Sequence, residues 1–361
     1  MVAVTDPVKL EILRSRLMAL TAEAETTLLK ASFSTIISLS QDFTVEAHDA
    51  RGYGLAHSRR SVSEFSALLP ITLRHFLTKF PVETLEPGDV LITNDPWQCA
   101  GHLGDFTVAL PVFHRGRVVA FMSSMAHHSD VGGTMDDTGA RDVFEEGVWI
   151  PITKLYQGGV VNRDVLEIIR ANVRTPDKVE GDLHAQIAAC EVGARQLRVL
   201  MDEFALPDFD SLAQALYDRA RHAMEEAIAA VPDGDYPFAV ELDGVDEQPL
   251  RIQVVVQVRG NRIHVDYSGT SQQVQAGINS TWTFTFAETV NAIKSVLIPE
   301  IPSTEGCFAP ITVTAPEGSI LNARPPAPVK GRTRTGFHIP SAIFGALAQV
   351  VPDKVQAHSG L

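Results

Sequence analysis

Two imidazoles and a carboxylate stand out in this sequence, because their types and spacing could hold a metal ion. His102 and Asp105 occur in the string GHLGD, and the adjacent His127 and His128 occur in AHHSD. Two imidazoles and one carboxylate form a ligand set that leaves coordination positions open for water or substrate. A buried cluster of hydrogen-bonded histidine and aspartate is the alternative interpretation, and the pattern alone does not separate the two.

A predicted hairpin separates the two halves of this set. Residues 106–113 and 118–122 are apolar runs, and they flank the polar segment 114–117, which contains a glycine. Continuous apolar runs around a glycine-containing turn are typical of two antiparallel strands. We therefore expect the chain to fold back at Arg115 and Gly116, so that the two ends of the hairpin meet.

This hairpin predicts which side chains converge. We expect Asp105 near Met125, and His102 near His127 and His128, because neighbouring antiparallel strands lie about 5 Å apart. Ionisable residues rarely lie at both ends of an apolar hairpin unless they are paired or coordinate something. The sequence therefore predicts one cluster that contains His102, Asp105 and one of the two later histidines.

The composition restricts the class of protein. The chain has 361 residues and a formal net charge of -14, and it shows no basic stripe that could neutralise phosphates. We therefore expect neither nucleic acid nor an anionic membrane as a partner. No uncharged run approaches the roughly 20 residues that span a bilayer. The three cysteines form no CxxC motif, and their odd number favours a reducing, cytoplasmic location over a disulfide framework.

The rest of the chain predicts a mixed α+β fold. We expect antiparallel hairpins and sheets packed with a central helical block, followed by a β-rich C-terminal part. Apolar residues at helical spacing predict helices over residues 163–172, 178–204 and 209–230. Further on, residues 251–258 and 263–267 predict a second hairpin around a glycine-containing turn.

The change in pattern predicts two domains. The Pro-Asp-Gly string at the end of the helical block marks a boundary near residues 231–236. We therefore expect a metal-site α+β domain with the helical block over residues 1–231, and a β-rich domain over residues 236–361.

Motifs for nucleotide binding and for serine nucleophiles are absent from the sequence. It contains no phosphate-binding loop of the type GxxxxGK[ST], no GxGxxG after a strand and no GxSxG elbow. Any ATP-driven step is therefore expected on another chain. A carboxylate is the expected general base beside a metal-bound water, and Asp130, Glu145 and Glu146 are the nearest candidates, although each also fits a loop charge. Asp130 is the preferred oxygen partner for the second N–H of a metal-bound imidazole.

Several ordered strings resemble the hydantoinase B/oxoprolinase family. This family includes N-methylhydantoinases, 5-oxoprolinases, lactamases such as caprolactamase, and acetone and acetophenone carboxylases. The strings extend over nearly the whole chain, and they read NDP…GHLGD, AHHSDVGG, FEEGVWIPITKL, NVRTPDKVEGDLHAQIAA, DYSGTSQQV…IN, TEGCFAPITVTAPEGSILNARPP and TRTGFHIPSAIFGALAQ.

The resemblance implies a divalent metal held by an HxxD pair and a later histidine. In this sequence these ligands fall on His102, Asp105 and His127, so the resemblance chooses His127 over His128. The metal is expected to be Mn, Zn or Fe, since imidazole and carboxylate ligands together do not select one of them. The residues that we expect to line the site are Asn94, Asp95, His128, Asp130, Asn172 and Arg174.

The resemblance also implies a partner and a reaction. A hydantoinase A-like subunit would bind ATP and phosphorylate the substrate, so that we expect a hetero-oligomer. This chain would be the B-type subunit of an ATP-dependent cyclic amide hydrolase, in which a metal-bound water attacks the phosphorylated hydantoin, oxoproline or lactam. Two alternatives stay open: a subunit of an ATP-dependent ketone carboxylase of the acetone or acetophenone type, and a metal-free scaffold subunit. Family members continue beyond the point where this sequence stops, so the second domain is expected to be incomplete at its C-terminus.

Overall fold

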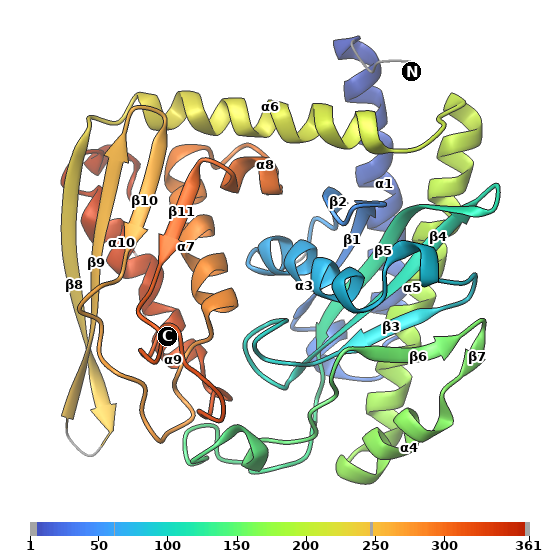
Figure 1. Cartoon of the computed structure of the whole chain (residues 1–361), viewed down its shortest axis with the longest axis horizontal. Helices are drawn as coiled ribbons and strands as arrows, with labels where there is room; N and C mark the ends of the chain where they lie inside the picture. Colours follow the sequence, from blue (N-terminus) through green and yellow to red (C-terminus); the bar gives the residue numbers. More distant parts are fainter. Residues whose placement is uncertain (1–5, 61, 246–247, 358–361) are drawn as a thin grey trace. The chain divides into compact units, whose positions relative to one another are not determined.

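The computed structural model of the chain describes residues 6–60, 62–245 and 248–357. Helices and mostly antiparallel strands occur throughout, which confirms the predicted α+β class (Figure 1). Within the described ranges, no helix combines the length and the apolar character that crossing a membrane requires. The last residue of the sequence, beyond which the resemblance predicts a continuation, lies outside these ranges.

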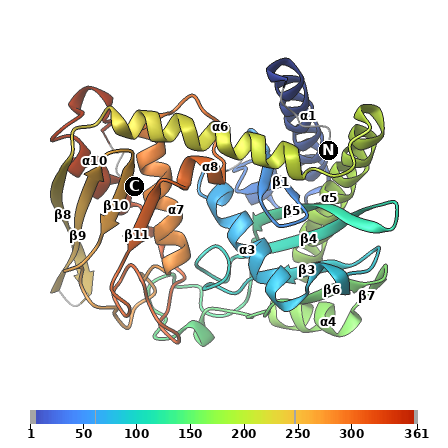
Figure 2. The ribbon, with the colours of Figure 1, turned by 45° about the horizontal axis from the view of Figure 1, so that its top comes forward.

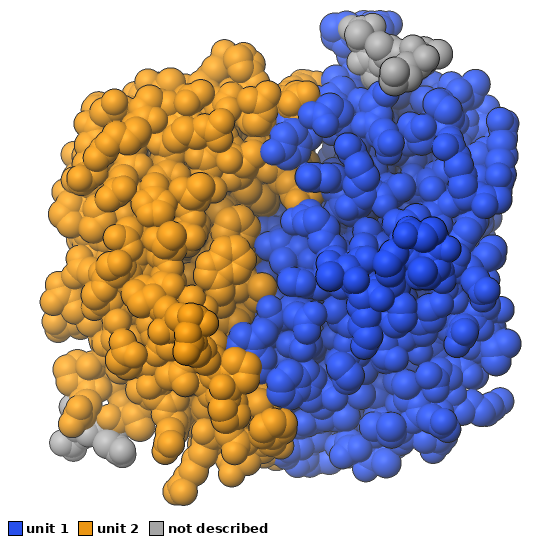
Figure 3. All heavy atoms as spheres, in the orientation of Figure 1, with its two compact units in different colours: residues 1–133, 147–217 blue, residues 134–146, 218–361 orange. Residues whose placement is uncertain are grey.

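The chain forms two compact units, which Figure 3 shows in different colours. Unit 1 contains residues 1–133 and 147–217, and unit 2 contains residues 134–146 and 218–361. The division falls inside the helix α6 (Asp210–Ala229). The predicted domain boundary near residues 231–236 stays a prediction, because compactness does not show which segments fold independently.

Unit 1 is built on a seven-stranded sheet with the strand order β2-β1-β5-β4-β3-β6-β7. Each strand is antiparallel to its neighbours. The predicted central hairpin is present as β4 and β5, and both strands extend further toward the predicted site than the apolar runs indicated. The strands are β1 (Phe43–Asp49), β2 (Gly54–His57), β3 (Val90–Thr93), β4 (Asp105–His114), β5 (Arg117–His127), β6 (Thr153–Gln157) and β7 (Val160–Val161).

Helices cover both faces of this sheet (Figures 1 and 2). Phe76 of α3 shares a buried apolar cluster with Phe121 of β5. The next residue of β5, Met122, contacts Gly193 of α5. Because successive strand residues point to opposite faces, α3 and α5 lie on opposite sides of the sheet. The helices of unit 1 are α1 (Pro7–Ala31), α2 (Thr35–Ser38), α3 (Phe65–Lys79), α4 (Arg163–Asn172), α5 (Pro176–Phe204) and the 3-10 turn Val82–Thr84.

Unit 2 contains a four-stranded sheet with the order β11-β10-β9-β8. Along β9 every second residue is buried, so one face of the sheet forms the core, and α10 packs on β8 and β9. The predicted hairpin is confirmed as β9 and β10. The elements are β8 (Gly234–Val245), β9 (Gln248–Arg259), β10 (Arg262–Asp266), α7 (Trp282–Leu297), α8 (Glu305–Phe308), β11 (Ile311–Thr314), α9 (Thr333–Gly336), α10 (His338–Leu347) and the 3-10 turns Val143–Glu145 and Pro352–Lys354.

Candidate metal centre

His102, Asp105 and His127 lie together at one end of the β4–β5 hairpin in unit 1. The Asp105 carboxylate lies between the two rings: His102 Nε2 is 2.8 Å from Oδ2, and His127 Nδ1 is 2.8 Å from Oδ1. Candidate ligand atoms from the three residues all lie within 4.8 Å of one another, and the ring centroids are 5.1 Å apart. The structure thus brings the three side chains together, and their role as ligands stays a prediction.

The pairing of β4 with β5 sets this geometry. Asp105 is the first residue of β4 and pairs with His127, the last residue of β5. The expected neighbour Met125 pairs instead with Thr107, so this sequence expectation is wrong by two residues. The error matters, because directly opposite residues of an antiparallel pair place their side chains on the same face.

The position of the turn accounts for one of the two residues by which the pairing of Asp105 differs from the expected one. Arg115 and Gly116 form a two-residue connection between the paired residues His114 and Arg117. Both connecting residues have positive φ, 50° for Arg115 and 79° for Gly116. This conformation matches the twist of the flanking strands and costs glycine little. This is the turn that the sequence predicts at Arg115 and Gly116, and a regular hairpin around it pairs Asp105 with Ala126, one residue beyond the expected Met125.

The other part comes from a bulge. Between Val112 and Phe113 of β4 the register shifts by one residue, so β5 contains one residue more than its partner there. Without the bulge, Asp105 would pair with Ala126. His127 would then project from the opposite face of the sheet, since a one-residue slip reverses every side chain. The bulge therefore decides whether the carboxylate and this imidazole can meet.

The segment between β3 and β4 carries His102, and Asn94 organises it. The Asn94 amide group donates to the carbonyls of Leu103 and Val148 at 2.8 and 2.9 Å. The Asn94 side-chain oxygen accepts a hydrogen bond from the Ile150 backbone amide at 2.7 Å. These bonds fix the backbone next to His102, so the predicted lining residue Asn94 acts on the site through the main chain.

Asp95, the next predicted lining residue, closes a turn. Its carboxylate accepts hydrogen bonds from the Trp97 backbone amide and the Gln98 side chain, both at 2.9 Å. The half-buried Trp97 ring lies 5.5 Å from the Trp149 ring, centroid to centroid. Asp95 therefore shapes the same loop as Asn94, and its bond to the Trp97 amide holds the loop residue that contacts Trp149.

Gly104 leaves the space that the two imidazoles occupy. A Cβ atom on this residue would lie 2.7 Å from His127 Cε1 and 2.9 Å from His102 Cε1. Contacts below 3.0 Å require a neighbour to move, and here both neighbours are the candidate ligand rings. Glycine is therefore needed at this position for both rings to keep their places.

The donor set fits a divalent metal. Two imidazole nitrogens and a carboxylate oxygen suit Zn, Fe and Mn. The side chains of Asp105 and His102 are 1% and 7% exposed, whereas that of His127 is 30% exposed. The cluster is therefore anchored in the interior and reachable from one side, which a site with open coordination positions requires. The same atoms also form the hydrogen-bonded cluster of the alternative interpretation.

His128 points away from this cluster, because adjacent residues of an extended chain alternate in direction. Its ring is buried, its Nε2 lies 3.0 Å from Oε1 of Gln186, and it packs edge-on against Phe106. Burial lowers the pKa of His128, so the ring is neutral. Of the two adjacent histidines, the structure brings His127 to Asp105, and the lining role of His128 stays a prediction.

Asp130 follows the hairpin and is held by Arg174. Its carboxylate accepts hydrogen bonds from the Arg174 guanidinium and backbone amide and from the Gly132 amide. Burial raises the pKa of Asp130, but these hydrogen bonds outweigh burial and hold the pKa below its usual value. Asn172 is exposed, and its side chain donates to the Ile168 carbonyl. Asp130 and Arg174 thus join the loop after the hairpin to the segment between α4 and α5, whereas the Asn172 side chain bonds within its own helix.

The remaining general-base candidates belong to unit 2. Glu145 is exposed and accepts a hydrogen bond from the Arg141 amide at 2.8 Å. Glu146 is buried, and its Oε1 accepts hydrogen bonds from the Val329 and Lys330 amides at 2.6 and 2.7 Å. Burial raises the pKa of Glu146 to about 7, although these amides and the Lys330 charge oppose the rise. A catalytic role for either glutamate stays a prediction.

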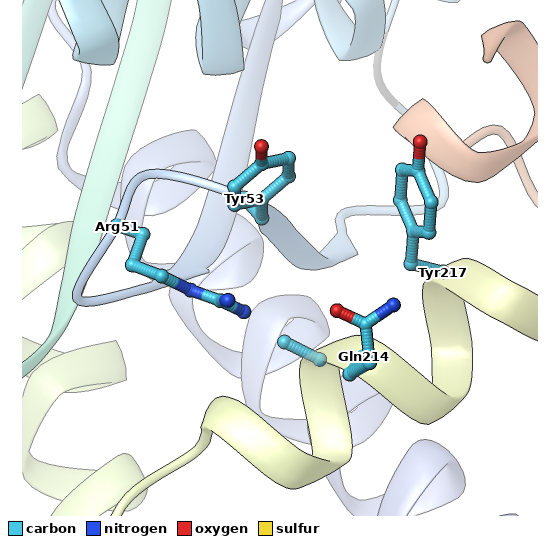
Figure 4. Close-up of a pocket in the computed structure, with 5 residues that line it drawn as sticks. Arg51, Tyr53, Gln214 and Tyr217 are labelled. Carbon is cyan, nitrogen blue, oxygen red and sulfur yellow. The ribbon is translucent and has the colours of Figure 1, made fainter.

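A cavity elsewhere in unit 1 offers weaker chemistry than the cluster. It has a volume of about 140 Å³ and lies between the β1–β2 turn and α6, where Tyr53, Gln214 and Tyr217 surround it with Arg51 (Figure 4). The Arg51 guanidinium is already paired with Asp49, at 2.8 Å. A pocket whose cation is satisfied by its own carboxylate has little left to recruit an anion, so we do not assign this cavity a function.

Two residues that shape the centre escaped the sequence analysis. Gly104 lies in the GHLGD string, but its steric role depends on both rings being present. Gln186 lies in the DLHAQ string and is fully buried on the Ala-rich face of α5. A polar residue at a buried helical position is the signal that could have revealed it, because such residues are retained only with hydrogen-bond partners.

Comparisons with known sequences agree with this architecture. A family model described as Hydantoinase B/oxoprolinase matches residues 6–361. The B-type subunit of a putative D-/L-hydantoinase from Pseudomonas sp. (strain NS671) is 32% identical, over 98% of this chain and 63% of the relative. The beta subunit of caprolactamase from Pseudomonas jessenii is 29% identical, over 98% of this chain and 62% of the relative. The chain therefore spans less than two thirds of the length of these relatives.

Two solved structures share the fold. The ATP-dependent caprolactamase from Pseudomonas jessenii matches with a TM-score of 0.89 at 28% identity, over 97% of this chain and 61% of that one. A nucleotide-free acetone carboxylase matches with a TM-score of 0.86 at 18% identity, over 98% of this chain and 50% of that one. At the identity of the second match, the likeness concerns the fold alone.

Proposed function

Because the chain belongs to the hydantoinase B/oxoprolinase family, we propose that it is the B-type subunit of an ATP-dependent cyclic amide hydrolase. The observation that carries this proposal is the cluster of His102, Asp105 and His127 at the end of the β4–β5 hairpin. The relatives named as a hydantoinase and as a caprolactamase support an amide ring as the substrate.

We propose that these three residues hold a divalent metal, Mn, Zn or Fe. Such an ion polarises a carbonyl oxygen and lowers the pKa of a bound water. The Asp105 carboxylate lies between the two rings, so that the donor atoms of all three residues converge, and Gly104 leaves room for the rings. His127 is the most accessible of the three, so the open side of the cluster is where a cyclic amide would approach. The general base stays open among Asp130, Glu145 and Glu146.

ATP would act through a partner. The sequence contains no phosphate-binding loop, whereas the structurally similar caprolactamase is ATP-dependent. We therefore propose that ATP is held by a hydantoinase A-like subunit, which phosphorylates the substrate in a hetero-oligomer with this chain.

The three cysteines are buried thiols, which supports the predicted cytoplasmic location.

The ketone carboxylase alternative rests on the fold shared with acetone carboxylase. At 18% identity that likeness carries no activity, and the relatives at 32% and 29% identity are named for amide substrates. We therefore place the hydrolase first. Incorporation of labelled bicarbonate into a panel of ketones, with no opening of any cyclic amide, would reverse this order.

The test is ATP-coupled ring opening by the chain co-expressed with its A-type partner. Hydantoin, 5-oxoproline and caprolactam are the first substrates, and metal content is measured in parallel by elemental analysis. His102→Ala and His127→Ala should each lose the metal and at least about 100-fold in turnover, more than the loss of an outer partner causes. His114→Ala, at the other end of the same hairpin, is the matched control.

Two results would refute the proposal. Turnover retained by His102→Ala after the metal is lost would show that the cluster is not the reactive centre. A wild-type chain that retains less than about a tenth of an equivalent of metal after supplementation, and still supports its partner, would favour the scaffold role.

A further inference from the structure

Gln186 of α5 forms hydrogen bonds with the β4–β5 hairpin. It is fully buried, and its side-chain Nε2 lies 3.1 Å from the Phe106 carbonyl and 3.3 Å from the Ser124 carbonyl. Its Oε1 lies 3.0 Å from Nε2 of His128. One side chain thus joins both strands of the hairpin and the residue that follows β5.

The chemistry of these partners fixes the orientation of the amide. Backbone carbonyls can only accept hydrogen bonds, so the NH₂ group of Gln186 must face Phe106 and Ser124. Oε1 must then face His128 and accept from it. Nε2 of His128 therefore carries a proton, and this hydrogen bond selects the Nε2 tautomer without any metal contact.

His128 passes this constraint to the predicted ligands. Its backbone amide donates to the Gly104 carbonyl at 2.9 Å. Gly104 is the residue whose Cα faces the rings of His102 and His127. His128 therefore ties the end of β5, which carries His127, to the loop that carries His102. A movement of His128 would therefore be transmitted to both of these segments.

We propose that Gln186 is a positioning residue of the metal centre. It locks His128 in one tautomer and one place, and His128 in turn holds Gly104 between the two imidazoles. This inference rests on the proposed function, because it assumes that the cluster binds a metal. It gives a reason for a buried polar residue on a helix face whose neighbours are Ala185 and Ala189.

Replacing Gln186 should change metal affinity less than replacing a residue that is hydrogen-bonded directly to a metal ligand. Such partners change metal affinity by about 10- to 100-fold. Gln186 acts through one further residue, so Gln186→Met should weaken binding by about five- to tenfold. Methionine has a similar volume and no hydrogen-bonding amide, so the helix packing is retained while the anchor is lost.

The experiment uses the full chain and the ion, Mn²⁺, Zn²⁺ or Fe²⁺, that the wild-type chain binds most tightly. Dissociation constants are compared for the wild type, Gln186→Met and Gln196→Met. Gln196 lies on the same helix and donates to Glu23, so it controls for the loss of a glutamine from α5. Gln196→Met should bind within twofold of the wild type.

A nitrogen NMR spectrum of histidine-labelled protein gives the second readout. The wild type should show His128 protonated on Nε2, assigned through its contact with the Phe106 ring. Gln186→Met should lose this single tautomer, whereas a purely structural role for Gln186 would lower the melting temperature and leave the tautomer and metal affinity unchanged. A proton on Nδ1 in the wild type would overturn the inference even if Gln186→Met did not fold.

The outcomes separate the two proposals. A wild-type chain that binds none of the three ions refutes the proposed function, and this inference falls with it. A wild-type chain that binds an ion, together with a Gln186→Met variant that binds equally well, refutes the positioning role alone.

Discussion

Asp105 in unit 1 and Glu146 in unit 2 are both buried carboxylates, with 0% and 1% of their surfaces exposed. Their partners differ in kind. Asp105 is flanked by two imidazoles at 2.8 Å, and Glu146 accepts hydrogen bonds from two backbone amides. Imidazole nitrogens can exchange a proton for a metal ion, whereas a backbone amide cannot.

The difference shows that burial of a charge does not itself identify a functional site. A buried carboxylate needs compensating partners in either case. Glu146 finds them in the backbone at Val329 and Lys330, so it holds the segment of residues 134–146 to a distant part of unit 2. Asp105 finds them in the side chains of the two predicted metal ligands His102 and His127, and the second of these remains accessible.

Replacing each carboxylate by its amide should separate the two regions most clearly. Asp105→Asn removes a charged ligand, so metal affinity should fall by about 1,000-fold, or about 4 kcal/mol. Glu146→Gln, the matched control in unit 2, should bind metal within twofold of the wild type. Isothermal titration with the ion that the wild type binds gives both values. Equal losses in the two variants would contradict the distinction drawn here.

Glu146 should instead affect how the free energy of unfolding depends on pH. Its folded-state pKa is about 7, above the ordinary value of 4.5, so the folded chain binds a proton that the unfolded chain releases. The resulting contribution to the free energy of unfolding is complete below pH 4.5 and is lost as the pH rises to about 7. It amounts to about 3 kcal/mol, from the size of the pKa difference.

The measurement is urea unfolding of the wild type and Glu146→Gln between pH 4.5 and 8. The wild-type free energy of unfolding should fall with rising pH relative to that of the variant, because glutamine does not titrate. The charges that face Glu146 are Lys330, which lowers its pKa, and Asp142, which raises it. Parallel curves for the two proteins would show that folding does not raise the pKa of Glu146.

Gly104→Ala tests how closely the imidazoles are packed. The added Cβ would meet two rings at 2.7 and 2.9 Å, so metal affinity should fall by about tenfold, or about 1.4 kcal/mol. Gly193→Ala is the control: its Cβ would meet the end of the flexible Met122 side chain, which can move. Titration of both variants should show a loss only for Gly104→Ala, and unchanged binding there would mean that the rings have room to shift.

The sequence could predict the hairpin and its ends because these depend on local patterns. Apolar runs around Arg115 and Gly116 were sufficient to bring His102 and Asp105 toward the later histidines. The register of the two strands was not predictable in this way. The bulge between Val112 and Phe113 has no recognisable pattern in the sequence, yet it shifts every pair from Val112 to Asp105 by one residue. Local patterns therefore indicate which segments meet, but not which side chains face each other.

Partners distant in the sequence were also beyond prediction. The strand β6 pairs with β3, although about 60 residues separate them, and its partly buried residues show no clear alternation. The same holds for Glu146, whose partners lie 183 and 184 residues away. Sequence patterns identified the ionisable residues, and only the fold could assign them to the two kinds of region.

Asp130 tests the distinction between a carboxylate of the metal site, such as Asp105, and a structural carboxylate, such as Glu146. Sequence reasoning made it a candidate oxygen partner for a metal-bound imidazole, but its oxygens are engaged by Arg174 and the Gly132 amide. That arrangement is closer to Glu146 than to Asp105. Asp130→Asn should therefore lower the free energy of unfolding by about 1 kcal/mol, as expected for a partly exposed pair that also caps backbone amides.

Metal affinity should stay within twofold in Asp130→Asn, because the amide keeps one oxygen for the backbone and no metal ligand is disturbed. Arg174→Gln is the matched control, since it removes the other half of the same pair and should give a similar loss of stability. A tenfold loss of affinity in Asp130→Asn alone would place this carboxylate with Asp105. The kind of hydrogen-bond partner would then not distinguish a carboxylate of the metal site from a structural one.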